Sequence, residues 1–210
     1  MKPTWIFDLD DTLHHASVAV FPHINRMMTE FIMRHLGLGT EDATALRQRY
    51  WQQYGATLKG LQQHHGIAPH IFLRDTHPMA ELEALLVWQA QTATLLRQLP
   101  GRKILLSNGP QHYVEGVLRK MRIRRHFDSI YGVERLALLP KPHPQSFRTV
   151  LQREGLDPAH CIMVEDSLPN LKTAKRLGMR TVWISHAARR PAYVDVRVRQ
   201  LQELLRLDLQ

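Results

Sequence analysis

Apolar residues in this chain gather in short runs near both ends and follow a helical period in between. Short stretches rich in apolar and β-branched residues occur at 5–7, 103–106, 129–133, 161–164 and 180–185. Runs of this length, bounded by Gly, Pro, Asp or Ser, predict buried β-strands. From residue 100 onward they alternate with stretches of helical spacing, which is typical of parallel sheets with right-handed crossovers. The pattern therefore predicts an α/β fold.

Residues 15–95 contain no strand-like run and carry apolar side chains at helical spacing. Pro22 is expected in the first turn of the first helix, because proline fits there without losing a hydrogen bond. Thr40 is expected to be the N-cap of the second helix. The spacing predicts helices over 22–36, 40–54, about 58–61 and about 80–99, with a loop over 66–78.

The helical block lies between two α/β segments, so it is an insertion rather than a separate amino-terminal domain. We expect a core domain formed by residues 1–14 and 96–210, and an all-helical domain formed by residues 15–95. The core is expected to be a Rossmann-like parallel sheet. Alternating valines at 194–198 predict its last edge strand, and a short helix over 201–207 is expected to close the chain.

The composition narrows the possible compartments. The chain has 210 residues, 44% of them hydrophobic. It has no apolar run long enough to span a membrane and no amino-terminal signal-peptide pattern, so we expect no membrane partner. The single cysteine, Cys161, lies in a predicted strand and fits a reducing compartment. We therefore expect a cytoplasmic protein.

The formal net charge is +9, and the positive residues are densest between Arg119 and Arg125. These residues surround the end of a predicted helix, where solvated cations are favourable. Aromatic residues are not interleaved with them in the way that single-strand binders use. We therefore do not expect nucleic acid as a partner. The surplus charge would instead attract a small phosphorylated metabolite.

Polar residues of particular kinds follow the predicted strands. Because the carboxyl ends of parallel strands lie at one edge of a sheet, their side chains should converge. Crowded carboxylates repel one another unless they share a hard cation such as Mg²⁺ or one of them stays protonated. Acids, a hydroxyl, an amide and a lysine around one point suit phosphoryl transfer, although each alone would be an ordinary turn or helix-start residue. The residues are Asp8, Asp10, Ser107, Asn108, Lys141, Glu165 and Asp166.

The stretch Asp8-Leu9-Asp10-Asp11-Thr12-Leu13 resembles the first motif, DxDxT, of the haloacid dehalogenase (HAD) superfamily of phosphotransferases. The other motifs of that superfamily follow in order over nearly the whole chain. The resemblance implies that Asp8 is the nucleophile and Asp10 the general acid/base. It also implies a Mg²⁺ ion on Asp8, the Asp10 backbone and Asp166, a phosphoryl site of Ser107, Asn108 and Lys141, and supporting roles for Glu165 and Thr12. Many members carry a further acid where this chain has Asn170.

The helical insertion resembles the C1 cap of this superfamily, which closes over the site and selects the leaving group. Residues 50–61 and 72–77 resemble the pyrimidine 5′-nucleotidase branch, which implies a nucleoside monophosphate substrate such as UMP or CMP. Related caps occur on phosphoglycolate phosphatases and β-phosphoglucomutases, which are alternatives. Haloacid dehalogenase itself fits poorly, because it does not need the second acid, Asp10. An alternative from another class is a catalytically silent, basic HAD-fold protein that binds nucleic acid or regulates.

Overall fold

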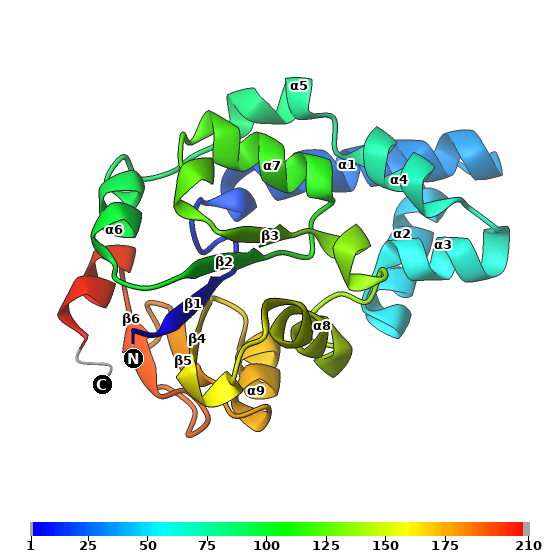
Figure 1. The fold of residues 1–210 in the computed structure, drawn as a ribbon. Helices are drawn as coiled ribbons and strands as arrows, with labels where there is room; N and C mark the ends of the chain where they lie inside the picture. Colours follow the sequence, from blue (N-terminus) through cyan, green and yellow to red (C-terminus); the bar gives the residue numbers. More distant parts are fainter. Residues whose placement is uncertain (1, 208–210) are drawn as a thin grey trace. The chain divides into compact units, whose positions relative to one another are not determined.

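The computed structural model describes residues 2–207, which form two compact units (Figure 1). One unit contains the chain up to His15 and from Val87 onward, and the other is the insertion Ala16–Leu86. The sequence assigned residues 87–95 to the insertion, whereas the structure places them with the sheet. The N–H of His15 donates to the carbonyl of Val87 at 2.7 Å, so the two connections to the insertion are joined there.

Six parallel strands form one sheet in the order β3-β2-β1-β4-β5-β6. In the middle of the sheet, Phe7 of β1 is in register with Leu105 of β2 and Val164 of β4. Parallel strands buried on both faces have continuous apolar sequences, which explains why the pattern predicted them. The α/β parallel-sheet fold is confirmed, with β6 at the edge. The strands are β1 (Thr4–Phe7), β2 (Lys103–Leu106), β3 (Ser129–Tyr131), β4 (Cys161–Glu165), β5 (Arg180–Ile184) and β6 (Val196–Val198).

Helices cover both faces of the sheet. In Figure 1, α7 lies on one side of the sheet, and α8 and α9 lie on the other. The core on the α8 and α9 side includes Ile6, Met163, Phe147 and Leu171, all fully buried. The helices of this unit are α6 (Thr92–Gln98), α7 (Gln111–Lys120), α8 (Pro144–Glu154) and α9 (Leu168–Arg176), with 3₁₀ helices η2 (Arg124–His126), η3 (Val133–Leu136), η4 (Pro158–His160) and η5 (Leu201–Arg206).

The insertion is helical and has a core of its own. Phe31 of α1 and Phe72 of α4 pack edge to face, with ring centroids 5.1 Å apart, and Leu61 and Leu82 are fully buried. Within residues 2–207 we find no helix with the length and apolar character that crossing a bilayer requires. The elements are α1 (Ala16–Leu36), α2 (Thr40–Tyr54), α3 (Thr57–His65), α4 (Pro69–Thr76), α5 (Met79–Leu82) and the 3₁₀ helix η1 (Glu83–Leu85).

Two helix starts differ from the prediction. α1 begins at Ala16, so Pro22 lies inside the helix rather than in its first turn. Pro22 lacks the N–H that would reach the carbonyl of Val18, but Val18 is exposed and solvent can satisfy that carbonyl. α2 begins at Thr40 itself, with Gly39 as its N-cap and no capping side chain. Pro22 therefore does not mark the start of α1, whereas Thr40 is the first residue of α2 rather than its N-cap.

The region between residues 66 and 99 also differs from the prediction. The predicted loop contains α4, because Pro69 occupies its first turn, where a missing N–H is tolerated, and Phe72 faces inward. The predicted helix over 80–99 is divided into α5, η1 and α6, because Leu86 is extended where the chain leaves the insertion. The predicted closing helix is the 3₁₀ helix η5.

Candidate active site

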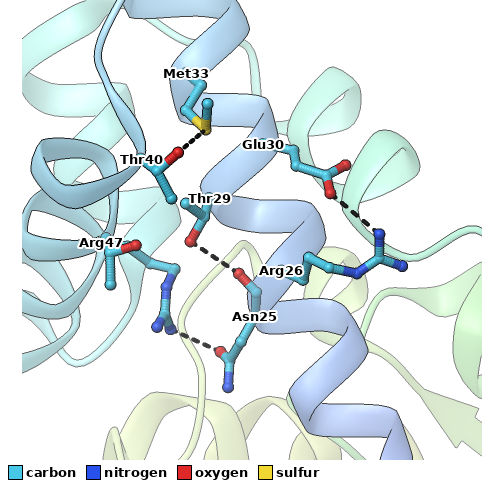
Figure 2. A pocket seen from close by; sticks show the side chains of 8 residues that line it. Asn25, Arg26, Thr29, Glu30, Met33, Thr40 and Arg47 are labelled. Carbon is cyan, nitrogen blue, oxygen red and sulfur yellow. Dashed lines mark hydrogen bonds and ion pairs between the residues drawn. The ribbon is translucent and has the colours of Figure 1, made fainter.

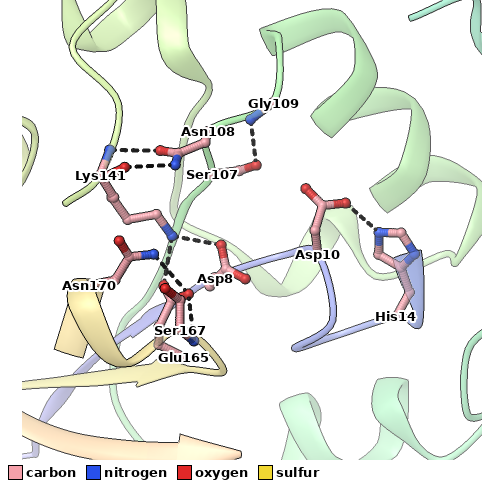
Figure 3. Close-up of polar contacts among 10 residues, drawn as sticks. All are labelled: Asp8, Asp10, His14, Ser107, Asn108, Gly109, Lys141, Glu165, Ser167 and Asn170. Carbon is pink, nitrogen blue, oxygen red and sulfur yellow. Dashed lines mark hydrogen bonds and ion pairs between the residues drawn. The ribbon is translucent and has the colours of Figure 1, made fainter. Parts of the chain in front are cut away.

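The strand ends bring polar residues to one edge of the sheet (Figure 3). Asp8 follows β1 directly, and its N–H donates to the carbonyl of Val164 on β4 at 3.0 Å. Ser107 follows β2, and its N–H donates to the carbonyl of Tyr131 on β3 at 2.9 Å. Glu165 is the last residue of β4. Because the sheet fixes these backbones, the predicted site residues begin from neighbouring, rigid positions.

A buried lysine lies between two buried carboxylates at this edge. The Nζ of Lys141 donates to Oδ1 of Asp8 at 2.6 Å and to Oε2 of Glu165 at 2.8 Å. The exposed fractions of Lys141, Asp8 and Glu165 are 3%, 6% and 1%. Burial alone would lower the pKa of Lys141, but the two carboxylates raise it above its ordinary value. Lys141 therefore carries a fixed positive charge beside Asp8.

The loop that carries Lys141 is held by Asn108. The side-chain Nδ2 of Asn108 donates to the Lys141 carbonyl at 2.9 Å, and the Lys141 N–H donates to Oδ1 of Asn108 at 2.7 Å. The next peptide bond, to Pro142, is cis, and the hydroxyl of Thr173 donates to the Pro142 carbonyl at 3.0 Å. Both ends of the Asn108 amide are thus bound to the lysine loop, which the sequence did not predict.

Three carboxylates crowd the same edge. Asp8, Glu165 and Asp166 each offer one oxygen, and these oxygens lie within 4.8 Å of one another. Burial, together with the charge of Glu165, raises the pKa of Asp8 to about 7. Burial and the charge of Asp8 raise the pKa of Asp166 to about 6. Raised pKa values in both groups mean that Lys141 alone does not compensate the negative charge.

This group of residues fits a Mg²⁺ ion. Mg²⁺ takes oxygen ligands and is commonly held by one or two carboxylates, with water and phosphate oxygens as its other ligands. A divalent cation would supply the positive charge that Asp8 and Asp166 lack. Glu165 is engaged elsewhere, because its Oε1 accepts from Nδ2 of Asn170 at 3.0 Å and from the N–H of Ser167 at 3.3 Å, and its Oε2 accepts from Lys141.

The second acid of the motif, Asp10, has different surroundings. Its Oδ1 lies 2.9 Å from Nε2 of His14 (Figure 3). The same oxygen accepts a hydrogen bond from the phenol of Tyr113 at 2.5 Å. Asp11, in the turn that follows Asp10, has a left-handed backbone conformation with φ 58°. Burial and the charge of Asp10 raise the pKa of Tyr113 well above its ordinary value, so the phenol keeps its proton.

Two further hydroxyls lie in this region. Ser107 is buried, and its Oγ accepts from the N–H of Gly109 at 2.9 Å. Thr12 is also buried, and its Oγ1 has no hydrogen-bond partner among residues 2–207. An unpaired buried hydroxyl is unfavourable in a finished core, so Thr12 is a group that a bound ligand or water could satisfy.

Sequence reasoning did not identify His14, Tyr113 or the anchoring role of Asn108. Tyr113 lies in the apolar stripe of its helix with Val114 and Val117, so the spacing predicts a core residue. His14 follows Asp10 by four positions, a spacing that brings side chains together in a helix, but this segment is a turn. The signals were therefore too weak to select these residues.

A hollow lies within the insertion, between α1 and α2 (Figure 2). Its two arginines are engaged by other side chains that line it: Nη1 of Arg47 donates to Oδ1 of Asn25 at 2.7 Å, and Nη1 of Arg26 lies 3.1 Å from Oε1 of Glu30. We place no part of the candidate active site there.

Solved structures share this fold across nearly the whole chain. A HAD phosphatase from Thermococcus onnurineus superposes with a TM-score of 0.72 at 21% identity, over 98% of this chain and 97% of that one. L-2-haloacid dehalogenase from Xanthobacter autotrophicus superposes with a TM-score of 0.64 at 20% identity, over 98% of each chain. The HAD-hydrolase YfnB from Bacillus subtilis, bound to magnesium, superposes with a TM-score of 0.64 at 17% identity, over 98% of this chain and 97% of that one. The fold is thus common to a phosphatase and a dehalogenase.

Several curated relatives are named as phosphatases. Hexitol phosphatase B from Escherichia coli strain K12 is 34% identical over 109 residues, which are 50% of this chain and 49% of that protein. The chain therefore spans about half the length of that relative. Phosphoglycolate phosphatase 1 from Pseudomonas aeruginosa is 25% identical over 197 residues, which are 86% of this chain and 68% of that protein.

The family profile of haloacid dehalogenase-like hydrolases matches residues 3–178. That range begins at β1, includes the insertion and ends after α9, so it contains each of the predicted site residues. The resemblance that the motifs indicated is confirmed at this level: the chain belongs to the haloacid dehalogenase-like hydrolase family.

Proposed function

We propose that this protein is a Mg²⁺-dependent phosphomonoester hydrolase that acts through an aspartyl-phosphate on Asp8. The observation that carries the proposal is the buried Asp8 carboxylate, which is paired with Lys141 at 2.6 Å and grouped with Asp166. A nucleophile for phosphorus needs positive charge around the oxygens of the transferring group. The relatives named as phosphatases support the same reaction class.

The proposed reaction has two halves. An oxygen of Asp8 attacks phosphorus, the bond from phosphorus to the leaving oxygen breaks, and Asp10 gives that oxygen a proton. Asp10 then takes a proton from water, which attacks the aspartyl-phosphate and releases phosphate. Mg²⁺, when bound by Asp8, Asp166 and the Asp10 carbonyl, supplies positive charge to the phosphoryl oxygens.

The remaining residues hold the phosphoryl group and the nucleophile. Lys141 offers its fixed charge to phosphoryl oxygens and orients Asp8 at the same time. The hydroxyl of Ser107 is a donor at the neighbouring strand end. The Asn108 amide is bound to the Lys141 backbone, so its proposed part in phosphate binding acts through that loop. Glu165 fixes the other side of the lysine.

For the substrate, we propose a pyrimidine mononucleotide such as UMP or CMP, selected by the insertion acting as a cap. This rests on the resemblance of residues 50–61 to pyrimidine nucleotidases. Tyr50 is not available to stack a base, because it is buried and its hydroxyl lies 2.8 Å from Nε2 of His65. Trp51 is 62% exposed, so its ring is more accessible than that of Tyr50.

A small polyol or hydroxy-acid phosphate is the second candidate substrate. It is favoured by the relatives, which are named as a hexitol phosphatase and a phosphoglycolate phosphatase. The phosphate-binding residues at the sheet edge are the same for either substrate class. Discrimination between the two must therefore come from groups that contact the rest of the molecule.

The test is phosphate release from UMP, CMP, AMP, phosphoglycolate, hexitol phosphates and p-nitrophenyl phosphate, with Mg²⁺ and with EDTA. We expect metal-dependent release, with the highest kcat/KM on UMP or CMP and none from the Asp8→Asn control. A highest kcat/KM on a hexitol phosphate or phosphoglycolate selects the second candidate. Interconversion of sugar phosphates without release contradicts both. A folded protein that is inactive on every substrate would support a catalytically silent binding or regulatory role.

A further inference from the structure

We propose that Tyr113 and His14 are positioning residues that hold the carboxylate of Asp10 for proton transfer. The proposal rests on the function proposed above, in which Asp10 is the acid and base. Tyr113 donates to Oδ1 of Asp10 at 2.5 Å, and Nε2 of His14 lies 2.9 Å from the same oxygen. The phenol oxygen also lies 3.4 Å from that His14 nitrogen, so the three groups form one compact cluster.

The cluster is assembled from two distant parts of the sheet unit. His14 comes from the turn after β1, where the N–H of Leu13 donates to the Leu9 carbonyl at 2.8 Å and turns the chain back. Tyr113 comes from α7, and only 1% of it is exposed. A Cβ at Gly109 would lie 2.7 Å from the Tyr113 ring, so the glycine after Ser107 and Asn108 leaves room for that ring.

The tautomer of His14 follows from its other nitrogen. Nδ1 of His14 is buried and has no hydrogen-bond partner among the described residues. A bare acceptor nitrogen in that position is less unfavourable than an unpaired N–H. The proton of a neutral His14 therefore resides on Nε2, and His14 donates to Asp10 as Tyr113 does.

A phenol and an imidazole on one oxygen suit a carboxyl group that must exchange a proton in one fixed direction. They fix the orientation of the side chain and direct the transferable proton to Oδ2, because Oδ1 already accepts two hydrogen bonds. A lysine in their place would hold Asp10 as an anion and oppose its action as an acid. Asp8 has such a partner in Lys141, although burial and the charge of Glu165 outweigh the lysine and raise the pKa of Asp8.

The test compares Tyr113→Phe with Tyr131→Phe. Tyr131 is a matched control, because it is equally buried and its phenol donates to a carboxylate oxygen of Glu154 at 2.5 Å, in a contact that does not involve Asp10. We measure kcat/KM for aryl and alkyl phosphates of increasing leaving-group pKa. Loss of a hydrogen bond to a charged group corresponds to roughly a 10–100-fold effect. In Tyr113→Phe we expect kcat/KM to fall by this factor for poor leaving groups and by about threefold or less for activated ones. In Tyr131→Phe the slope of kcat/KM against leaving-group pKa should not change.

The slope against leaving-group pKa is insensitive to partial unfolding, because a smaller active fraction lowers every kcat/KM equally. In an Asp10→Asn background, Tyr113→Phe should have almost no further effect on that slope. An unchanged slope in Tyr113→Phe with active wild-type protein overturns this inference and leaves the proposed function standing. Wild-type protein that releases no phosphate overturns the proposed function, and the positioning role with it.

A measurement without turnover completes the test. Nitrogen-15 NMR of histidine-labelled protein should show His14 with its proton on Nε2. A proton on Nδ1 would mean that His14 does not donate to Asp10, and would overturn its part of the proposal. Asp10→Asn should shift the His14 signal, whereas Tyr131→Phe should leave it unchanged.

Discussion

Asp8 and Asp10 are two residues apart, yet they lie in environments of opposite character. The Asp8 cluster, formed by Asp8, Lys141, Glu165 and Asp166, is an ion-pair network in which a buried cation touches two buried carboxylates. The Asp10 cluster, formed by Asp10, His14 and Tyr113, surrounds one carboxylate oxygen with a phenol and an imidazole.

The difference shows how one strand end can support two chemical roles. Asp8 contacts Lys141, whereas Asp10 contacts Tyr113 and His14, so the two acids have separate sets of partners. Lys141 orients the residue proposed to attack phosphorus and favours its ionised form, against the effects of burial and of Glu165. A phenol and an imidazole orient the residue proposed to exchange protons. Each of the following predictions concerns a change to the Asp8 cluster, to the Asp10 cluster or to both.

The largest expected effect separates the two isosteric variants Asp8→Asn and Asp10→Asn. Asp8→Asn removes the nucleophile, so turnover and phosphoenzyme should both be undetectable. Asp10→Asn keeps the nucleophile but removes proton transfer, which should lower kcat by roughly 10²–10⁴-fold. Phosphate release and mass spectrometry of quenched reactions measure both outcomes.

Leaving-group dependence provides the control for this pair. A substrate whose leaving oxygen needs no proton should restore much of the first step in Asp10→Asn and nothing in Asp8→Asn. Equal responses of the two variants to leaving-group pKa would contradict the assigned roles and remove the functional contrast between the clusters.

The next effect concerns stability of the Asp8 cluster. Lys141→Met leaves Asp8 and Glu165 as buried carboxylates without their cation, and removing one partner of a buried ion pair costs about 3–5 kcal/mol. We expect the free energy of unfolding in urea to fall by that amount near neutral pH. Lys175→Met is the matched control, because Lys175 pairs with Asp195 at 2.6 Å where both side chains are over a third exposed. In Lys175→Met the free energy of unfolding should fall by about 1 kcal/mol or less.

The metal prediction follows from two carboxyl groups. The pKa of Asp8, about 7, and that of Asp166, about 6, both lie above 3.8, the ordinary value. In the metal-free fold these groups bind protons that the unfolded chain has already released, so the fold loses stability as pH rises from about 4 to about 7. Mg²⁺ needs ionised carboxylates, so its binding strengthens over the same range.

We therefore expect excess Mg²⁺ to raise Tm more at about pH 8 than at about pH 5.5. At a hundredfold excess over Kd the stabilisation is about 2.7 kcal/mol. Calorimetric scans of wild type and Asp8→Asn, each with Mg²⁺ and with EDTA, measure this effect. A Mg²⁺-dependent shift of equal size at both pH values, or one retained in Asp8→Asn, would contradict the metal site.

Sequence patterning predicted most of the sheet because its strands are buried on both faces. The run Trp5-Ile6-Phe7 had to be a central strand, and the acids after it had to lie at the strand end. The helix α4 was missed because Pro69 is compatible both with a loop and with a helix start. Helix boundaries near Pro22 and Leu86 depended on tertiary packing, which local propensity does not encode.

The Asp8 cluster was predictable and the Asp10 cluster was not, for a physical reason. Acids and a lysine at strand ends are unusual enough in sequence to indicate a charged site. A tyrosine in an apolar helix stripe resembles any core residue, and its hydroxyl reveals its role only through a contact between Tyr113 and Asp10 across the fold. The sequence named Asn108 as a phosphate-binding residue, but the direction of its amide depends on the Lys141 loop.

The smallest expected effect is that of Asn170→Asp, which tests the role of an amide at the position where the resemblance to the superfamily implies a further acid. Nδ2 of Asn170 donates to Oε1 of Glu165 at 3.0 Å in a buried position. An aspartate would replace this donor with a carboxylate facing another carboxylate. Without metal, we expect the free energy of unfolding to fall by about 1–3 kcal/mol at about pH 8, because a hydrogen bond to a charged group is lost.

The loss should shrink at about pH 5.5, since a proton shared between the two carboxyl groups relieves their repulsion. The pKa of the new group is then raised in the fold, so its destabilising effect grows as pH rises. Excess Mg²⁺ should recover part of the loss if the new carboxylate reaches the metal. Urea titrations at both pH values, with Mg²⁺ and with EDTA, measure these changes in the free energy of unfolding. A loss independent of pH and Mg²⁺ would mean that Asn170 acts by packing, and that the Asp8 cluster does not extend to it.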